Sequence, residues 1–143
     1  MRKLLVFLMS LVASVGLAAL PSSASATALA SLSGSSYNNC ARVSGDFSWT
    51  YRGNYDGYPG YSTSGTAHIR RGNSACSLTP VFQFKGWVYS GTSSWVPINT
   101  FRTLSTGIGS VDLSFDNGVT RLIEFRICNR QPDGRINGCG PVS

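Results

Sequence analysis

Apolar and polar side chains alternate along much of the chain after residue 40, which is the pattern of half-buried β-strands. In the first such stretch the odd-numbered positions carry Val43, Phe47, Trp49 and Tyr51. The segment Cys76–Tyr89 is apolar on both faces, so it predicts a central strand covered on both sides. Residues 95–104 predict another strand, which Pro97 restricts to a sheet edge or a bulge.

A second pair of alternating stretches lies near the C-terminus and predicts a β-hairpin. The two stretches carry Val111, Leu113 and Phe115, then Val119, Ile123, Phe125 and Ile127. Between them, Asp116-Asn117-Gly118 is a turn sequence that supplies the positive φ angles of a tight hairpin. On the polar face we expect Glu124 and Arg126 to pair at the surface.

The remaining segments predict turns and short strands. Gly53–Gly65 is rich in glycine and predicts a loop, Thr66–Arg71 predicts a short strand, and Ser31–Asn39 predicts a frayed lead-in. Glu124 and Lys85 are the only glutamate and lysine after residue 30, so the residues that favour helices are scarce. The chain therefore predicts an all-β fold, a small antiparallel β-sandwich or barrel of about 6–8 strands.

The N-terminal segment has the order of a secretory signal peptide. A basic start, Met1-Arg2-Lys3, precedes the apolar run Leu4–Leu20, and two small-x-small cleavage sequences end at Ala26 and Ala30. We expect residues 1–30 to be a signal peptide and residues 31–143 to be a secreted, extracellular β domain, with either alanine able to end the signal. A retained membrane anchor is the alternative, because the apolar run reaches the lower limit of a spanning helix.

Four cysteines in an exported chain predict two disulfides. Of the three possible pairings we favour that of sequence neighbours, Cys40–Cys76 and Cys128–Cys139, because turn-forming residues between Cys128 and Cys139 fold the chain back. A zinc site is the alternative, but no C-x-x-C pair is present and His68 is the only histidine. We predict no metal and no cofactor.

The charge is modestly basic. Without Arg2 and Lys3 the chain has ten basic and six acidic side chains, a net charge of +4. Such an excess aids solubility and favours anionic partners such as wall polymers or nucleic acid. The preference for arginine over lysine, beside this signal sequence, resembles that of small secreted proteins of actinobacteria.

The most distinctive stretch is the aromatic, glycine-rich segment from Trp49 to Tyr61. Its candidate binding residues are Trp49, Tyr51, Arg52, Tyr55, Tyr58 and Tyr61. Aromatic rings on a loop offer a large contact area at low entropic cost, and they stack on sugars or fill a partner's pocket. The alternative is that the rings only cover the core. We expect a monomer whose partner is an extracellular protein or a carbohydrate.

The sequence Ser48-Trp49-Thr50-Tyr51-Arg52 resembles the Trp-Arg-Tyr triplet of the small two-disulfide α-amylase inhibitors from actinobacteria. Thr50 stands where that triplet has arginine, and Arg52 follows the tyrosine instead. The cysteine spacing and the chain length also differ. The resemblance implies that an inhibitory function should be considered beside simple binding.

An enzymatic alternative depends on His68 and Glu124. They could serve as an acid–base pair, with Arg70 and Arg71 holding a phosphate, as in small secreted ribonucleases. No nucleophile-elbow, zinc-protease, phosphate-loop or dinucleotide motif is present in the sequence. We therefore expect a non-catalytic binding or inhibitory module. A ribonuclease-like hydrolase and a binder of polyanions or wall polymers are the alternatives, and nucleic acid is not the expected partner.

Overall fold

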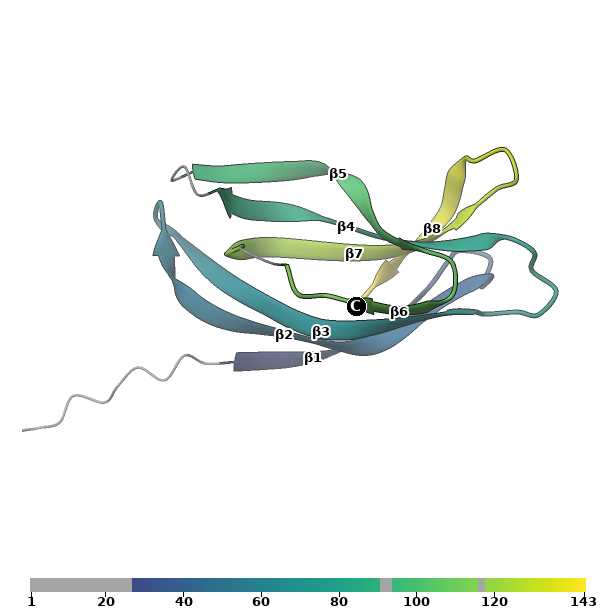
Figure 1. Cartoon of the computed structure of the whole chain (residues 1–143), viewed down its shortest axis with the longest axis horizontal. Coiled ribbons are helices and arrows are strands. Elements are labelled where there is room, and N and C mark those ends of the chain that lie inside the picture. The colour runs from purple at the N-terminus through teal and green to yellow at the C-terminus, as the bar shows by residue number, and fades with distance from the viewer. Residues whose placement is uncertain (1–26, 91–93, 116–117) are drawn as a thin grey trace, which may run out of the picture.

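The computed structural model describes residues 27–90, 94–115 and 118–143, and this part of the chain is all-β (Figure 1). The strands are β1 (Thr27–Ser35), β2 (Ala41–Tyr55), β3 (Tyr58–Arg71), β4 (Thr79–Ser90), β5 (Ser94–Thr106), β6 (Gly109–Asp112), β7 (Thr120–Arg130) and β8 (Ile136–Val142). No helix occurs among the described residues. The predicted fold class is confirmed.

The strands pair in the order β5-β4-β7-β8-β1-β2-β3-β6, and a further bridge joins Tyr61 of β3 to Thr120 of β7. That bridge closes β7, β8, β1, β2 and β3 into a five-stranded barrel, from which β4 and β5 extend beyond β7. In Figure 1 the result has two layers, with β5, β4 and β7 above β1, β2, β3 and β6.

The core lies between these layers and is built around aromatic rings. Phe125 stacks on Phe82 with ring centroids 5.4 Å apart and meets Phe47 edge-to-face at 5.1 Å. Each such pair contributes about 0.5–1.5 kcal/mol beyond simple burial. The other buried core residues include Leu32, Ala41, Val43, Ala67, Ile69, Phe84, Ile98, Leu113 and Ile127.

Several sequence predictions for individual strands are confirmed. Val43 and Phe47 are buried in β2, as their alternation indicates. The fourth strand, β4, lies inside the sheet between β5 and β7, and its residues 80–84 are buried on both faces. The neighbouring strand that contains Pro97 is an edge strand, as the missing N–H of proline requires.

The prediction of a loop over Gly53–Gly65 is wrong, because this segment continues β2 and β3 as a long hairpin. The turn is only Asp56-Gly57, whose φ angles of 48° and 78° are those of a tight hairpin turn. Gly60 serves close packing, since a Cβ there would lie 2.1 Å from Val119 Cγ1. Here glycine marks a crowded strand rather than an irregular one.

The predicted C-terminal hairpin is also wrong in its pairing. The first of its strands, β6, pairs with β3, whereas β7 pairs with β4 and β8. The predicted turn at Asp116-Asn117 lies outside the described residues. Glu124 forms an ion pair with Lys85 at 2.9 Å rather than with Arg126. The Nε of Arg126 donates to Gln83 Oε1 at 2.8 Å. Strand pairing is non-local, so short-range alternation could not choose between these partners.

The predicted lead-in is ordered as a strand over most of its length. Residues 31–35 belong to β1, which begins at Thr27 and pairs with β2 from Thr27↔Thr50 to Ser35↔Arg42. The domain boundary predicted after Ala30 therefore falls inside this strand.

Both predicted disulfides are present, Cys40–Cys76 and Cys128–Cys139. The first joins the start of β2 to the β3–β4 connection, and the second joins β7 to β8. The β3–β4 and β7–β8 connections lie at the right-hand end of the molecule in Figure 1, which we call the disulfide end. The described residues contain no helix long and apolar enough to cross a membrane.

Candidate functional site

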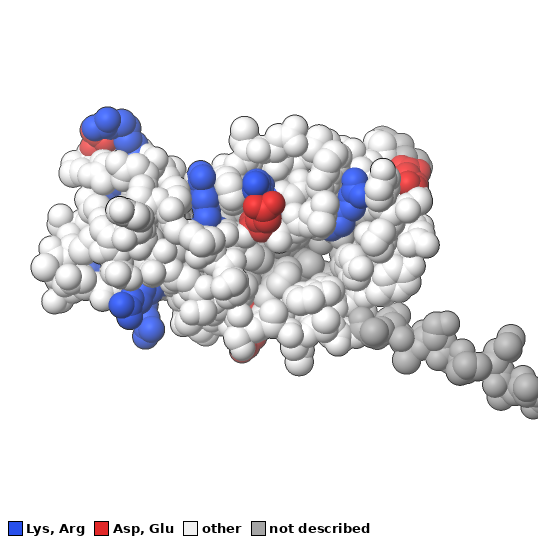
Figure 2. Space-filling view, turned by 180° about the vertical axis from the view of Figure 1, so that it is seen from behind, with Lys and Arg blue, Asp and Glu red and all other residues white. Residues whose placement is uncertain are grey.

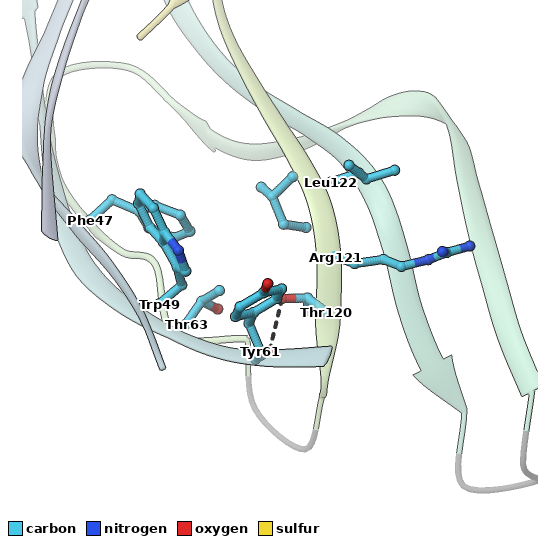
Figure 3. A pocket seen from close by; sticks show the side chains of 8 residues that line it. Phe47, Trp49, Tyr61, Thr63, Thr120, Arg121 and Leu122 are labelled. Atoms are coloured by element: carbon cyan, nitrogen blue, oxygen red, sulfur yellow. Dashed lines mark hydrogen bonds between the residues drawn. The ribbon is translucent and has the colours of Figure 1, made fainter. Parts of the chain in front are cut away.

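A cavity of about 280 Å³ lies toward the opposite end, between β2 and β3 on one side and β7 on the other (Figure 3). We call it the aromatic cavity. Its lining residues are Phe47, Trp49, Tyr61, Thr63, Thr120, Arg121, Leu122 and Ile123. The volume is close to the lower limit for ligand pockets, so the cavity suits a single ring or one side chain.

The alternation of side chains along β2 and β3 determines which of their residues line the cavity. Trp49 lies directly opposite Thr63 in the register of the two strands, two residues beyond Phe47 along β2. Residues two apart in a strand share a face, so Phe47 and Trp49 point to the same side. Their rings are 5.9 Å apart. Figure 3 shows Trp49, Thr63 and Tyr61 side by side on this wall.

The opposite wall is formed by β7, where the backbone is irregular. Thr120 Oγ1 donates to the carbonyl oxygen of Tyr61 at 3.2 Å and fixes the two walls together. Beside it, Leu122 has φ 51° and a side chain that is 71% exposed, within a bulge opposite Gly86. A leucine in the left-handed region costs about 1–3 kcal/mol, and such strain concentrates at functional sites.

Two of the lining residues carry a buried polar atom that has no hydrogen-bond partner within the described chain. These atoms are Thr63 Oγ1 and Arg121 Nε. Buried hydroxyls normally have a partner, and leaving one without costs about 1–3 kcal/mol. Thr63 lies between Trp49 and Tyr61 in Figure 3, and a hydroxyl can both donate and accept hydrogen bonds.

Next to the cavity, Arg121 lies within a group of aromatic rings. Its guanidinium carbon is 3.9 Å from the ring centroid of Tyr58 and 4.8 Å from those of Trp87 and Trp95. Trp95 Nε1 also donates to the carbonyl oxygen of Tyr55 at 2.8 Å. The aromatic cluster is defined here as Tyr55, Tyr58, Trp87, Tyr89 and Trp95. It fastens the tip of the β2–β3 hairpin to the tip of the β4–β5 hairpin.

The structure does not bring the six predicted binding residues together in one place. Trp49 and Tyr61 line the aromatic cavity, whereas Tyr55 and Tyr58 belong to the cluster. Tyr51 packs against Tyr61 at 5.9 Å and donates to Asn54. Exposed Arg52 lines a separate hollow beside Ser62 and Thr63.

Sequence reasoning did not find Thr63, Arg121 or Ile123. A threonine in a strand carries no distinguishing pattern, and the role of Arg121 depends on rings from three other strands. Trp87 and Trp95 could have been chosen as candidates from the sequence, since large aromatic residues concentrate at binding sites.

The residues of the enzymatic alternative lie on different strand pairs. His68 Nδ1 is 2.8 Å from Ser110 Oγ, between β3 and β6, whereas Glu124 pairs with Lys85 between β7 and β4. Arg70 shares the face of His68, and Arg71, one residue on, points to the other face. No group of three His, Cys, Asp or Glu suited to a metal occurs in the described part of the chain.

Asp112 and Arg126 have shifted pKa values, and neither lines the aromatic cavity. The Ser114 backbone N–H, 2.7 Å from a carboxylate oxygen, lowers the pKa of Asp112. Partial burial lowers the pKa of Arg126, because desolvation disfavours the charged guanidinium.

Comparison with known proteins gives no relative. No protein-family model matches the chain, and neither a curated protein nor a solved structure matches it.

Proposed function

We propose that the protein is a secreted binding module that holds one ring or apolar side chain of its ligand in the aromatic cavity. The observation that carries this proposal is the buried, unpartnered hydroxyl of Thr63, placed between the rings of Trp49 and Tyr61. A ligand with an apolar body and one polar atom would fill the cavity and give this hydroxyl its missing hydrogen bond.

The surroundings of the cavity favour a neutral group. Its walls are mainly aromatic and aliphatic, and the guanidinium of Arg121 is already held over the rings of the cluster. Arg121 is the only charged residue among those that line the cavity, and Figure 3 shows its side chain directed away from the cavity. A phenol-like side chain or a sugar ring has the required combination of an apolar face and a hydroxyl.

Single-ring probes test this proposal. Phenol and methyl glucoside would be titrated separately against the mature protein, with the Trp49 indole N–H and the Ile123 methyl groups followed by NMR. We expect shifts confined to the cavity for at least one probe, and loss of the shift of the Ile123 methyl groups in Trp49→Ala. Tyr37→Ala is the control, because Tyr37 is 89% exposed and near the disulfide end. No shift with either probe, or shifts that survive Trp49→Ala, would contradict the proposal.

Secretion is part of the same proposal. The two disulfides are compatible with export. Residues 27–30 pair with β2, so cleavage after Ala26 keeps them in the sheet, whereas cleavage after Ala30 removes them. Mass spectrometry of the secreted protein should give Thr27 as the first residue. A mature chain that begins at Ser31 would lose four paired residues of β1 and would refute this cleavage site.

A polyanion binder is the second candidate, favoured by one observation. Arg42 and Arg70 are directly opposite each other on β2 and β3, and like charges in this position repel. Figure 2 shows basic side chains on the face that it displays, including a group at one end without an acidic neighbour in that view. We expect the protein to be retained on heparin, with retention that falls as the salt concentration rises. The double variant Arg42→Ser, Arg70→Ser should not be retained. Retention unchanged by both substitutions would exclude this candidate.

A further inference from the structure

A second hollow lies on the outer face of the layer formed by β5, β4 and β7. Lys85 and Glu124 are directly opposite each other on β4 and β7, one residue along from the core pair Phe84 and Phe125. Side chains alternate along a strand, so Lys85 and Glu124 point away from the core. We call the space beside them the outer hollow. Its volume is about 190 Å³, and its lining includes Lys85, Gly86, Trp87, Asn99, Leu122 and Glu124.

Two bulges at the same level of β4 accompany the outer hollow. On one side, three residues of β5, 99–101, are placed opposite the single residue Lys85. On the other side, residues 122–123 of β7 are placed opposite the single residue Gly86. Bulges turn side chains in new directions and are over-represented next to active sites. Here the irregular backbone on both sides of β4 coincides with a hollow that polar side chains line.

The polar side chains of the outer hollow are held in place but keep free hydrogen-bonding capacity. Lys85 Nζ is 2.9 Å from Glu124 Oε2 and 5.0 Å from the ring centroid of Phe101. An ammonium has three N–H donors and a carboxylate has two acceptor oxygens, so this ion pair leaves groups for a ligand. The side-chain amide of Asn99 has no hydrogen-bond partner within the described part of the chain. It adds a donor and an acceptor to the same hollow.

The indole of Trp87 supplies the large apolar surface of the outer hollow. The guanidinium carbon of Arg121 lies 4.8 Å from the centroid of this ring and restrains its orientation. Leu122 adds a second apolar side chain. A sugar ring has an apolar C–H face and a rim of hydroxyls, so it can stack on an indole while its hydroxyls reach the polar groups beside it.

We propose that the outer hollow is a binding site for a neutral saccharide, with one pyranose ring stacked on Trp87. A sugar hydroxyl both donates and accepts, so neighbouring hydroxyls can bond to Glu124 and Lys85 at once and leave their ion pair intact. An anionic ligand would be repelled by Glu124, and a cationic ligand by Lys85. A wholly apolar ligand would take the water from all three polar groups without replacing its hydrogen bonds. This site is distinct from the aromatic cavity, and it does not rest on the proposed function.

Two neutral trisaccharides test this proposal on the purified protein. Cellotriose and maltotriose contain the same sugar ring with different linkages. NMR titration follows the Trp87 indole N–H and the Asn99 side-chain amide, while the Trp49 indole N–H reports on the aromatic cavity. We expect saturable shifts of Trp87 and Asn99 with at least one trisaccharide. Shifts of Trp49 alone, or no saturable shift with either sugar, would overturn the proposal.

Three variants show whether the lining residues carry the binding. Trp87→Ala should abolish saturable binding, because the stacking surface is lost. Asn99→Ala should weaken binding roughly threefold to tenfold through the loss of one hydrogen bond, and it should leave the free energy of unfolding unchanged, since this residue is exposed. Thr100→Ala is the matched control, because Thr100 is an exposed neighbour that does not line the hollow.

The control should change the affinity less than about twofold. Saturable binding in a folded Trp87→Ala would overturn the proposal. If Trp87→Ala does not fold, the comparison of Asn99→Ala with Thr100→Ala decides, and equal affinities of these two variants would overturn the proposal.

Discussion

The two ends of the molecule are held together by different means. At the disulfide end, Cys40–Cys76 and Cys128–Cys139 tie four segments covalently, and Val81, Phe82 and Ile127 between them are completely buried. At the other end the aromatic cluster and Arg121 hold the two hairpin tips without a covalent bond. The difference indicates that one end is fixed covalently, whereas the other, which contains the aromatic cavity, is held by side-chain contacts and hydrogen bonds.

Burial along the shared strands follows this division. The first half of β4 is buried on both faces, whereas Trp87, Val88 and Tyr89 in its second half are only partly buried. In β7, Cys128 and Asn129 are buried, and Arg121 and Ile123 near the other end are not. The aromatic cavity lies in this less densely packed half.

The largest effect is expected from the disulfide end. Replacing Cys128 and Cys139 together by alanine should lower the free energy of unfolding by about 2–5 kcal/mol, because the cross-link constrains the unfolded chain. Urea denaturation of the purified protein measures this change. A loss below about 1 kcal/mol would mean that this bridge contributes little and that the two ends do not differ in this way.

A smaller and local effect is expected from the aromatic end. Trp95→Ala removes a ring over Arg121 and the hydrogen bond to Tyr55, and should cost about 2 kcal/mol. Hydrogen exchange should increase at the β2–β3 tip and stay unchanged near the two disulfides. Uniformly faster exchange across the molecule would show that the ends are not independent.

The smallest effect, and one of opposite sign, is expected at the β7 bulge. Leu122→Gly should raise the free energy of unfolding by about 0.5–1 kcal/mol, because glycine adopts φ 51° without strain. Leu29→Gly is the matched control, since this leucine is similarly exposed but lies in a regular strand. This variant should lower the free energy of unfolding by a similar amount. If both variants lower the free energy of unfolding by the same amount, Leu122 is not strained.

The sequence predicted the framework better than the site. Alternation found β2, the apolar faces identified β4 as internal, and Pro97 placed β5 at an edge, because these signals are local. The sequence prediction failed at Gly60, where glycine allows close packing inside a strand, and at β6, whose partner strand is distant in the sequence. Trp49 and Tyr61, which were predicted from their aromatic character, line the aromatic cavity. Thr63 was not predicted, since only the surrounding fold leaves its hydroxyl without a partner.

The central claim, that the aromatic end holds a ligand cavity, is tested most directly by Thr63→Val. Valine has nearly the shape of threonine, so this change removes the buried hydroxyl and little else. We expect the free protein to become more stable, by about 1 kcal/mol, while binding of phenol or methyl glucoside in the cavity weakens by about fivefold to tenfold. Loss of stability with unchanged probe binding would contradict the account, because the hydroxyl would then serve the fold and not a ligand.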